Sequence, residues 1–145
     1  MKWRLMFVLL VVFLAVTALS AADYIGAAKC KMCHKVQYES WQGLAHAKAL
    51  DRLSPEEQAK AECLGCHATN SNVELPGVQC ESCHGPGSEY KSMKIMKDQA
   101  ASVAAGLVVP TEATCKACHE GAPHDQKAFD FASAQEGGVH AHKTE

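Results

Sequence analysis

Eight cysteines and eight histidines in this chain of 145 residues are spaced in a regular way. Every cysteine belongs to a C-x-x-C pair, and a histidine directly follows each pair. The four motifs are Cys30–His34, Cys63–His67, Cys80–His84 and Cys115–His119. In such a motif the two thiols can add to the vinyl groups of haem, while the adjacent imidazole binds the iron. The spacing therefore predicts four covalently bound haem c groups.

Other uses of cysteine explain this pattern less well. Four disulfides are the default expectation for eight cysteines in an exported protein, and C-x-x-C pairs also occur in zinc sites and redox-active dithiols. None of these explains a histidine after every pair. The predicted thioether cysteines are Cys30, Cys33, Cys63, Cys66, Cys80, Cys83, Cys115 and Cys118, and the predicted proximal iron ligands are His34, His67, His84 and His119.

Four further histidines are candidates for the opposite side of the irons. His46 is flanked by alanines, which would let a porphyrin approach closely; otherwise it is a solvent-facing residue of a helix. His140 and His142 are two positions apart and point in different directions, so we expect one of them to ligate. His124 lies too near His119 to reach the far side of the same haem. It is therefore a ligand of another haem or an exposed loop residue.

The N-terminal residues 1–22 have the pattern of a signal peptide. Lys2 and Arg4 precede an almost unbroken apolar run over residues 5–19, and small residues follow at 20–22. The alternative is an uncleaved anchor, but the apolar run is shorter than the roughly 20 residues that span a bilayer. We expect export to the periplasm or beyond, with residues 23–145 forming a tetrahaem cytochrome c domain that contacts the membrane only if the segment is uncleaved.

The composition bounds the partners and the fold. The chain has 14 Lys and Arg against 16 Asp and Glu, and loss of Lys2 and Arg4 would leave 12 against 16. This balance, without a basic run, argues against nucleic acid. About 123 residues with few aromatics would bury a small core, so the porphyrins must supply most of the buried apolar area. The haem-free chain is expected to be largely unfolded.

The segments between the motifs predict a mostly α, compact, single-domain multihaem cytochrome with little or no sheet. Apolar spacing predicts helices over residues 36–53, 88–106 and 126–135. Ser54–Glu57 forms a capping box that predicts a short helix running to Cys63. Thr111 is a predicted cap for the helix of the fourth motif, and Gly121 a predicted stop. Residues 68–79 and 85–87 are predicted loops.

Three parts of the chain resemble the cytochrome c-554 family. They are residues 30–49, residues 77–87, and Phe129–Phe131 together with the terminal histidines. That family comprises exported tetrahaem electron carriers, one of which accepts electrons from hydroxylamine oxidoreductase in nitrifying bacteria. The resemblance implies a helical fold with haems in stacked and perpendicular pairs, mostly with two histidine ligands. It also implies that His46 and one terminal histidine are distal ligands, and that the haem at Cys63, Cys66 and His67 is five-coordinate.

The chain departs from the family pattern in two respects. It is shorter, lacking insertions around the second and fourth motifs, so the family's docking surface does not carry over. The family also has a distal histidine about ten residues after the third motif, where this chain has Met93 and Met96. Either His124 substitutes, or one of these methionines ligates, or that iron is open; as an alternative, both methionines are core residues.

These observations favour an electron-transfer protein that exchanges single electrons with a donor protein and an acceptor protein, rather than an enzyme. An enzymatic alternative is a reductase of nitrogen oxides at a five-coordinate haem. A structural alternative is a polymeric haem wire, in which a spare histidine ligates an iron of a neighbouring copy in a homo-oligomer.

Overall fold

The computed structural model describes residues 21–120, 124, 128–137 and 139–141. In this part of the chain the regular elements are helices, and the sheet-like pairing consists of isolated bridges from Ala68 to Pro76 and Gly77. The predicted mostly α fold is confirmed. The predicted signal peptide falls almost wholly outside the described residues. Within them, no helix has the length and apolar character needed to cross a membrane.

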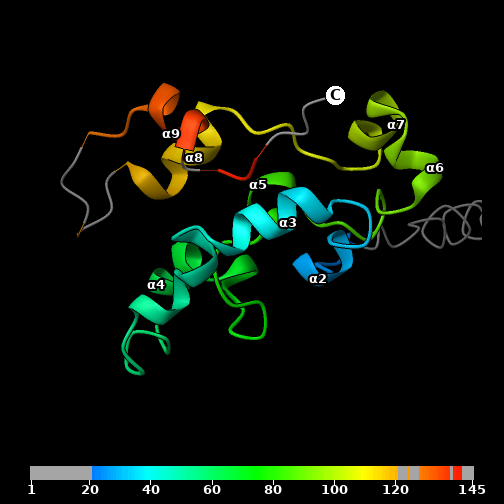
Figure 1. Ribbon diagram of the computed structural model, residues 1–145. Helices are drawn as coiled ribbons and strands as arrows, with labels where there is room; N and C mark the ends of the chain where they lie inside the picture. Colours follow the sequence, from blue (N-terminus) through cyan, green and yellow to red (C-terminus); the bar gives the residue numbers. More distant parts are fainter. Residues whose placement is uncertain (1–20, 121–123, 125–127, 138, 142–145) are drawn as a thin grey trace, which may run out of the picture.

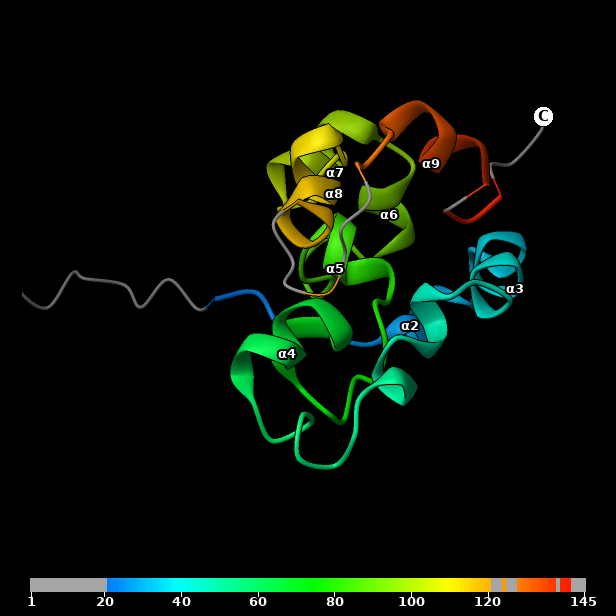
Figure 2. The same ribbon diagram turned by 90° about the vertical axis from the view of Figure 1, so that its left-hand side faces the viewer.

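The helices are short and are joined by extended segments (Figure 1). The α-helices are α2 (Ala27–Cys30), α3 (Lys35–Gln42), α4 (Ala61–His67), α5 (Cys80–His84), α6 (Met93–Met96), α7 (Gln99–Ala104), α8 (Glu112–His119) and α9 (Phe131–Gly137). Three 3₁₀ turns lie at η1 (His46–Lys48), η2 (Leu50–Arg52) and η3 (Thr69–Ser71). Helix α5 lies in the middle of the molecule, with α2 to α4 on one side and α6 to α9 on the other (Figures 1 and 2).

The first long predicted helix is interrupted. The prediction was a helix over residues 36–53, but α3 ends at Gln42 and tight turns follow. A tertiary contact contributes, because the carbonyl of His46 accepts a hydrogen bond from Val78 N at 2.9 Å in addition to the local one from Ala49 N at 3.2 Å. The indole of Trp41 donates to Val78 O at 2.8 Å, which holds α3 against the same loop.

The other boundaries also differ from the predictions. Residues 88–106 form two helices because Ser92 and Asp98 each cap a new one, accepting hydrogen bonds from Ile95 N and Ala101 N. The capping box of Ser54 and Glu57 is present, but it closes only a turn, and α4 starts at Ala61. The last helix, α9, begins later than predicted, at residue 131.

Two predicted local features are confirmed. Thr111 caps α8 through a reciprocal pair of hydrogen bonds with Thr114. Residues 85–87 form a loop, and Gly85 has a positive φ of 76°. The predicted stop at Gly121 lies outside the described residues.

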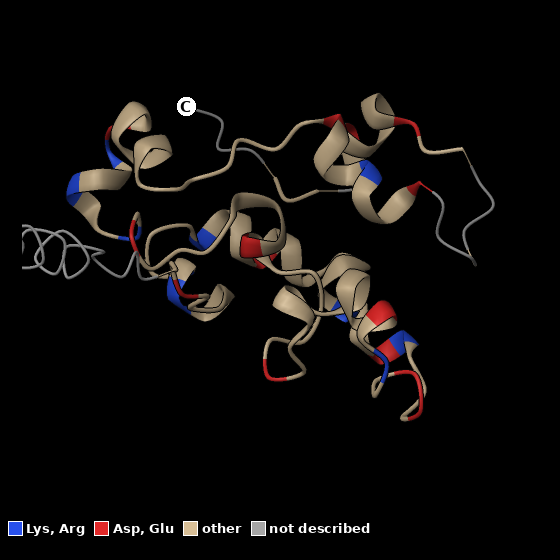
Figure 3. Cartoon of the chain, turned by 180° about the vertical axis from the view of Figure 1, so that it is seen from behind, with Lys and Arg blue, Asp and Glu red and all other residues tan. Residues whose placement is uncertain are grey.

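Few apolar side chains are buried in the described part of the chain. Those under the surface are Ala27, Leu50, Ala68 and Tyr90. Several larger ones are exposed, including Met32 and Met93. Charged residues of both signs are interspersed over the helices and loops (Figure 3). The protein part alone therefore supplies little apolar burial, which agrees with a fold organised around large apolar cofactors.

Candidate haem sites

Each of the four motifs lies on or beside a helical turn. The third motif is the whole of α5, the second and fourth end α4 and α8, and the first spans the end of α2 and the turn before α3. Residues three and four apart share one face of a helix. In the second, third and fourth motifs the two cysteines and the histidine therefore project toward the same side, as attachment to one porphyrin requires. In the first motif, Cys33 N and His34 N both donate to Cys30 O, which closes a single turn.

The cysteines of different motifs approach one another. All eight are free of disulfides. A hydrogen bond with the Cys80 thiol raises the pKa of the Cys30 thiol, which joins the first motif to the third. Burial and a hydrogen bond with Cys66 raise the pKa of Cys118 to about 12, which joins the second motif to the fourth. Haems attached at these positions would be neighbours in two pairs.

The third and fourth motifs connect the two pairs. Burial raises the pKa of the Cys83 thiol, and the charge of a nearby Cys115 thiolate raises it further. Cys83 and Cys115 are therefore near enough for their charges to interact. The motifs are neighbours in the order first, third, fourth and second.

Three of the four motif histidines face a histidine from outside the motifs. The ring centroids of His46 and His119 lie 5.9 Å apart. Those of His67 and His124 lie 5.7 Å apart, and those of His84 and His140 lie 6.1 Å apart. Two imidazoles bound to opposite sides of one metal ion, at about 2 Å per bond, have centroids about 6 Å apart. The three pairs therefore have the spacing of axial ligand pairs.

Backbone carbonyls orient several of these rings. The Nδ1 atom of His67 lies 2.7 Å from Ala49 O, and that of His84 lies 3.1 Å from Val108 O. His140 Nδ1 lies 3.0 Å from its neighbour's carbonyl, Ala141 O. A carbonyl only accepts hydrogen bonds, so Nδ1 carries the proton and Nε2 presents its lone pair. Metal-binding histidines are held in this way.

The remaining predicted site residues are placed less completely. His142 lies outside the described residues. Within the described part of the chain, the three histidine ring pairs do not include His34. Burial lowers the pKa of His84, and the positive charges of His140 and His34 lower it further. His34 therefore lies near the third motif. Met93 is 63% exposed, and the Met96 sulfur lies 4.0 Å from Ser102 Oγ.

A buried carboxylate that sequence reasoning missed fixes the third motif. The Glu81 side chain is 2% exposed and accepts hydrogen bonds from three backbone N–H groups. The donors are Ile25, Gly26 and Gly87, at 2.7 to 3.1 Å. A buried charge is tolerated only when it is fully hydrogen-bonded. No signal in the sequence could have found it, because a charged residue at this position is expected at the surface and only the fold brings the three donors together.

The loop before the third motif positions His46. Gly77 has a φ of 79°, and a Cβ atom at this position would lie 2.6 Å from Ala47 O and 2.9 Å from His46 O. Only glycine allows so close an approach of two backbones. Together with the hydrogen bond from Val78 N to His46 O, this approach fixes the backbone of His46 where its ring faces His119.

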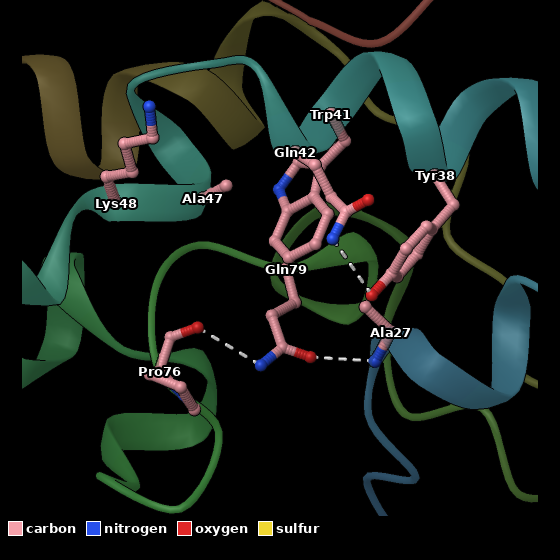
Figure 4. A pocket seen from close by; sticks show the side chains of 8 residues that line it. All are labelled: Ala27, Tyr38, Trp41, Gln42, Ala47, Lys48, Pro76 and Gln79. Atoms are coloured by element: carbon pink, nitrogen blue, oxygen red, sulfur yellow. Dashed lines mark hydrogen bonds between the residues drawn. The ribbon is translucent and has the colours of Figure 1, made fainter.

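An open pocket of about 330 Å³ lies between α2, α3 and the same loop (Figure 4). Its lining residues are Ala27, Tyr38, Trp41, Gln42, Ala47, Lys48, Pro76 and Gln79. The Gln79 amide forms part of the pocket wall, where it accepts a hydrogen bond from Ala27 N at 2.7 Å and donates one to Pro76 O at 3.1 Å. No motif cysteine or histidine is among these lining residues.

The donor set fits haem better than a zinc site. Among the described residues, no three of the side chains of His, Cys, Asp and Glu come together as a metal site would require. The paired histidine rings, the one-sided helical motifs and the small apolar core match instead an iron between two imidazoles within a porphyrin.

Comparisons with known proteins agree with this geometry. A family model described as cytochrome c554 and c-prime matches residues 29–85. Cytochrome c-554 from Nitrosomonas europaea is 32% identical over an alignment that covers 70% of this chain and 61% of the relative. The chain thus spans about three fifths of the length of that relative.

The solved structures include a relative with the same fold. The reduced state of cytochrome c554 from Nitrosomonas europaea aligns with a TM-score of 0.61 and 28% identity. The alignment covers 85% of this chain and 87% of that one. The likeness therefore extends beyond the part of the chain that the family model matches.

Proposed function

The chain belongs to the cytochrome c-554 family, and from this membership we propose that it is an exported electron-transfer protein with four covalently bound haem c groups. The observation that carries the proposal is the pairing of histidines. His67, His84 and His119 each face a second histidine at a ring distance typical of two axial ligands. A pair of histidines fills both axial positions of an iron, which suits electron transfer rather than substrate binding.

The chain's own residues hold and separate the redox groups. When bound, haem iron supplies one-electron chemistry. The thiols of the four motifs would form the thioether bonds. The hydrogen bonds of Cys30 with Cys80 and of Cys66 with Cys118, and the charge interaction of Cys83 with Cys115, support neighbouring positions along one path. Glu81 and the carbonyls of Ala49 and Val108 hold the ligands in fixed orientations.

Export and partners complete the proposal. Residues 1–22 direct the chain out of the cytoplasm, and their cleavage leaves a mature chain from about Asp23. The haems are attached after export, on the extracytoplasmic side of the membrane. A donor protein and an acceptor protein exchange electrons with it at the surface. Reduction of a nitrogen oxide would need an iron with an open sixth position, and a haem wire would need a histidine that reaches another copy of the chain. The three histidine pairs instead favour irons whose two axial ligands come from the same chain.

The test is to express the full chain in a host that exports and matures c-type cytochromes. We expect the intact mass of the periplasmic protein to show cleavage near Asp23 and four covalent haems, all reduced and reoxidised reversibly. A Cys115→Ser/Cys118→Ser variant should lack one haem in the same measurement. Retention in the cytoplasm, fewer than four haems in the parent, or bound zinc would contradict the proposal.

A further inference from the structure

His124 is a predicted distal ligand, but the sequence does not indicate which iron it would bind. Its ring lies opposite that of His67, with 5.7 Å between centroids and an interplanar angle of 48°. The other two pairs are separated by 5.9 and 6.1 Å. Each of these three contacts joins one motif histidine to one histidine from outside the motifs. The His119 ring also stacks on Phe129, with 5.0 Å between centroids.

The path of the chain explains how His124 reaches the second motif. Helix α8 ends at His119, and the backbone is extended at Glu120. Cys118 contacts Cys66, so the chain leaves α8 beside α4. The far side of His119 is already taken by His46. A histidine five residues further on is therefore close to α4 and has the His67 site as its neighbour.

His67 itself is oriented to share an iron with it. Its Nδ1 atom lies 2.7 Å from Ala49 O and must donate to that carbonyl. The Nε2 atom therefore carries the lone pair that binds a metal. Ala49 lies between the turns η1 and η2, which places this carbonyl on the same part of the chain that positions His46.

We infer that His124 is the second axial ligand of the iron at His67, so that this iron is six-coordinate in this chain. The resemblance to the family implies a five-coordinate haem at this position. This inference rests on the proposed function only in requiring a haem on Cys63 and Cys66.

The first experiment compares carbon monoxide binding to the dithionite-reduced holoprotein and to a His124→Gly variant. Carbon monoxide binds readily only where the sixth position is open. The variant should bind one more equivalent per chain than the parent and gain a high-spin signal when oxidised, and added imidazole should reverse both changes. An Ala128→Gly variant places a glycine in the same segment without removing an imidazole, and should match the parent.

A second variant identifies which iron is affected. In a Cys63→Ser/Cys66→Ser background, which lacks the haem of the second motif, His124→Gly should cause no further change in the spin state or in carbon monoxide binding. If this background does not accumulate, the crystal structure of the oxidised four-haem holoprotein gives the ligand on the His67 iron directly.

The failure of this inference is distinguishable from the failure of the proposed function. A protein with four covalent haems, in which His124→Gly leaves carbon monoxide binding unchanged, would overturn the inference alone. So would a persistent effect of His124→Gly in the three-haem background, because His124 would then ligate another iron. The proposed function fails instead on the haem count of the parent.

Discussion

Residues 23–110 and residues 111–141 are held in place by different kinds of contact. In the first region, side chains form direct hydrogen bonds with distant backbone groups. Glu81 accepts from Ile25 N and Gly26 N, and the Trp41 indole donates to Val78 O. In the second region, which includes α8 and α9, the described connections to the first include the three histidine ring pairs and the interactions of Cys115 with Cys83 and of Cys118 with Cys66. The long-range hydrogen bond from Ala141 N to Ser40 Oγ adds one more.

This difference bears on how a short chain would hold the four haems that we propose. The second region supplies one partner of each histidine pair, namely His119, His124 and His140. In the proposed haem-bound protein, an iron between the rings of each pair would strengthen the attachment of this region. The first region has the Glu81 hydrogen bonds as a scaffold of its own. The two regions should respond differently to loss of haem and to loss of that scaffold.

Removing the haems should have the largest effect. The full chain, expressed without c-type haem maturation, should be largely unfolded, because its own apolar side chains bury little area. The loss should be complete in residues 111–141, whose ring contacts need iron. Hydrogen exchange followed by mass spectrometry measures both regions. Native-like protection of residues 111–141 in the haem-free chain would show that this region does not need haem iron to stay folded.

Glu81→Gln in the holoprotein should have the next largest effect. An amide in place of the carboxylate loses charge and turns a donor toward backbone N–H groups, so we expect a loss on the order of 3 kcal/mol of unfolding free energy. Guanidinium unfolding measures it. Glu89, whose described hydrogen bond is an exposed one from Ser88 Oγ, provides the control, and Glu89→Gln should change stability by less than about 0.5 kcal/mol. Equal losses would remove the role assigned to Glu81.

Glycines with positive φ should differ according to their surroundings. Gly77→Ala and Gly106→Ala both place a Cβ atom in the left-handed region, at about 1 kcal/mol each. At Gly77 the Cβ also meets the carbonyl oxygens of Ala47 and His46, whereas at Gly106 nothing lies within 4 Å. Gly77→Ala should therefore destabilise more and also perturb the low-spin signal of the iron at His119. The same change in both variants would show that the loop does not position His46.

The smallest effect is expected at the surface of α8. Hydrogen bonding and charge from Glu112, with a further contribution from Glu120, raise the pKa of Lys116. Exposed pairs of this kind contribute little. Lys116→Ala should leave the thermal midpoint nearly unchanged at neutral pH and the haem spectra identical. A marked loss of stability would mean that α8 is held by its surface charges rather than by its histidine.

The local chemistry could be predicted from sequence, but the tertiary contacts could not. Helical turns at the cysteine motifs and the cap at Thr111 follow from neighbouring residues. The break after Gln42 coincides with Gly43 at the end of α3, a local signal that the apolar spacing over residues 36–53 obscured. Val78, which lies far along the chain, holds the segment after the break. Ser92 and Asp98 did carry a cap signal, which the apolar stripe across residues 88–106 obscured.

The histidine pairs show the same limit. Sequence separates motif histidines from the others, yet His124 could be assigned to the His67 site only once α8 was seen beside α4. Glu81 was missed because a charged residue beside a cysteine is usually solvated, and only the fold brings three N–H groups to it.

Electron paramagnetic resonance of the oxidised, purified holoprotein tests the central claim most directly, because it separates irons with two histidine ligands from five-coordinate ones. The histidine pairs at His67, His84 and His119 predict low-spin signals of bis-histidine type from at least three of the four irons. A spectrum in which two or more irons are high-spin would contradict the account.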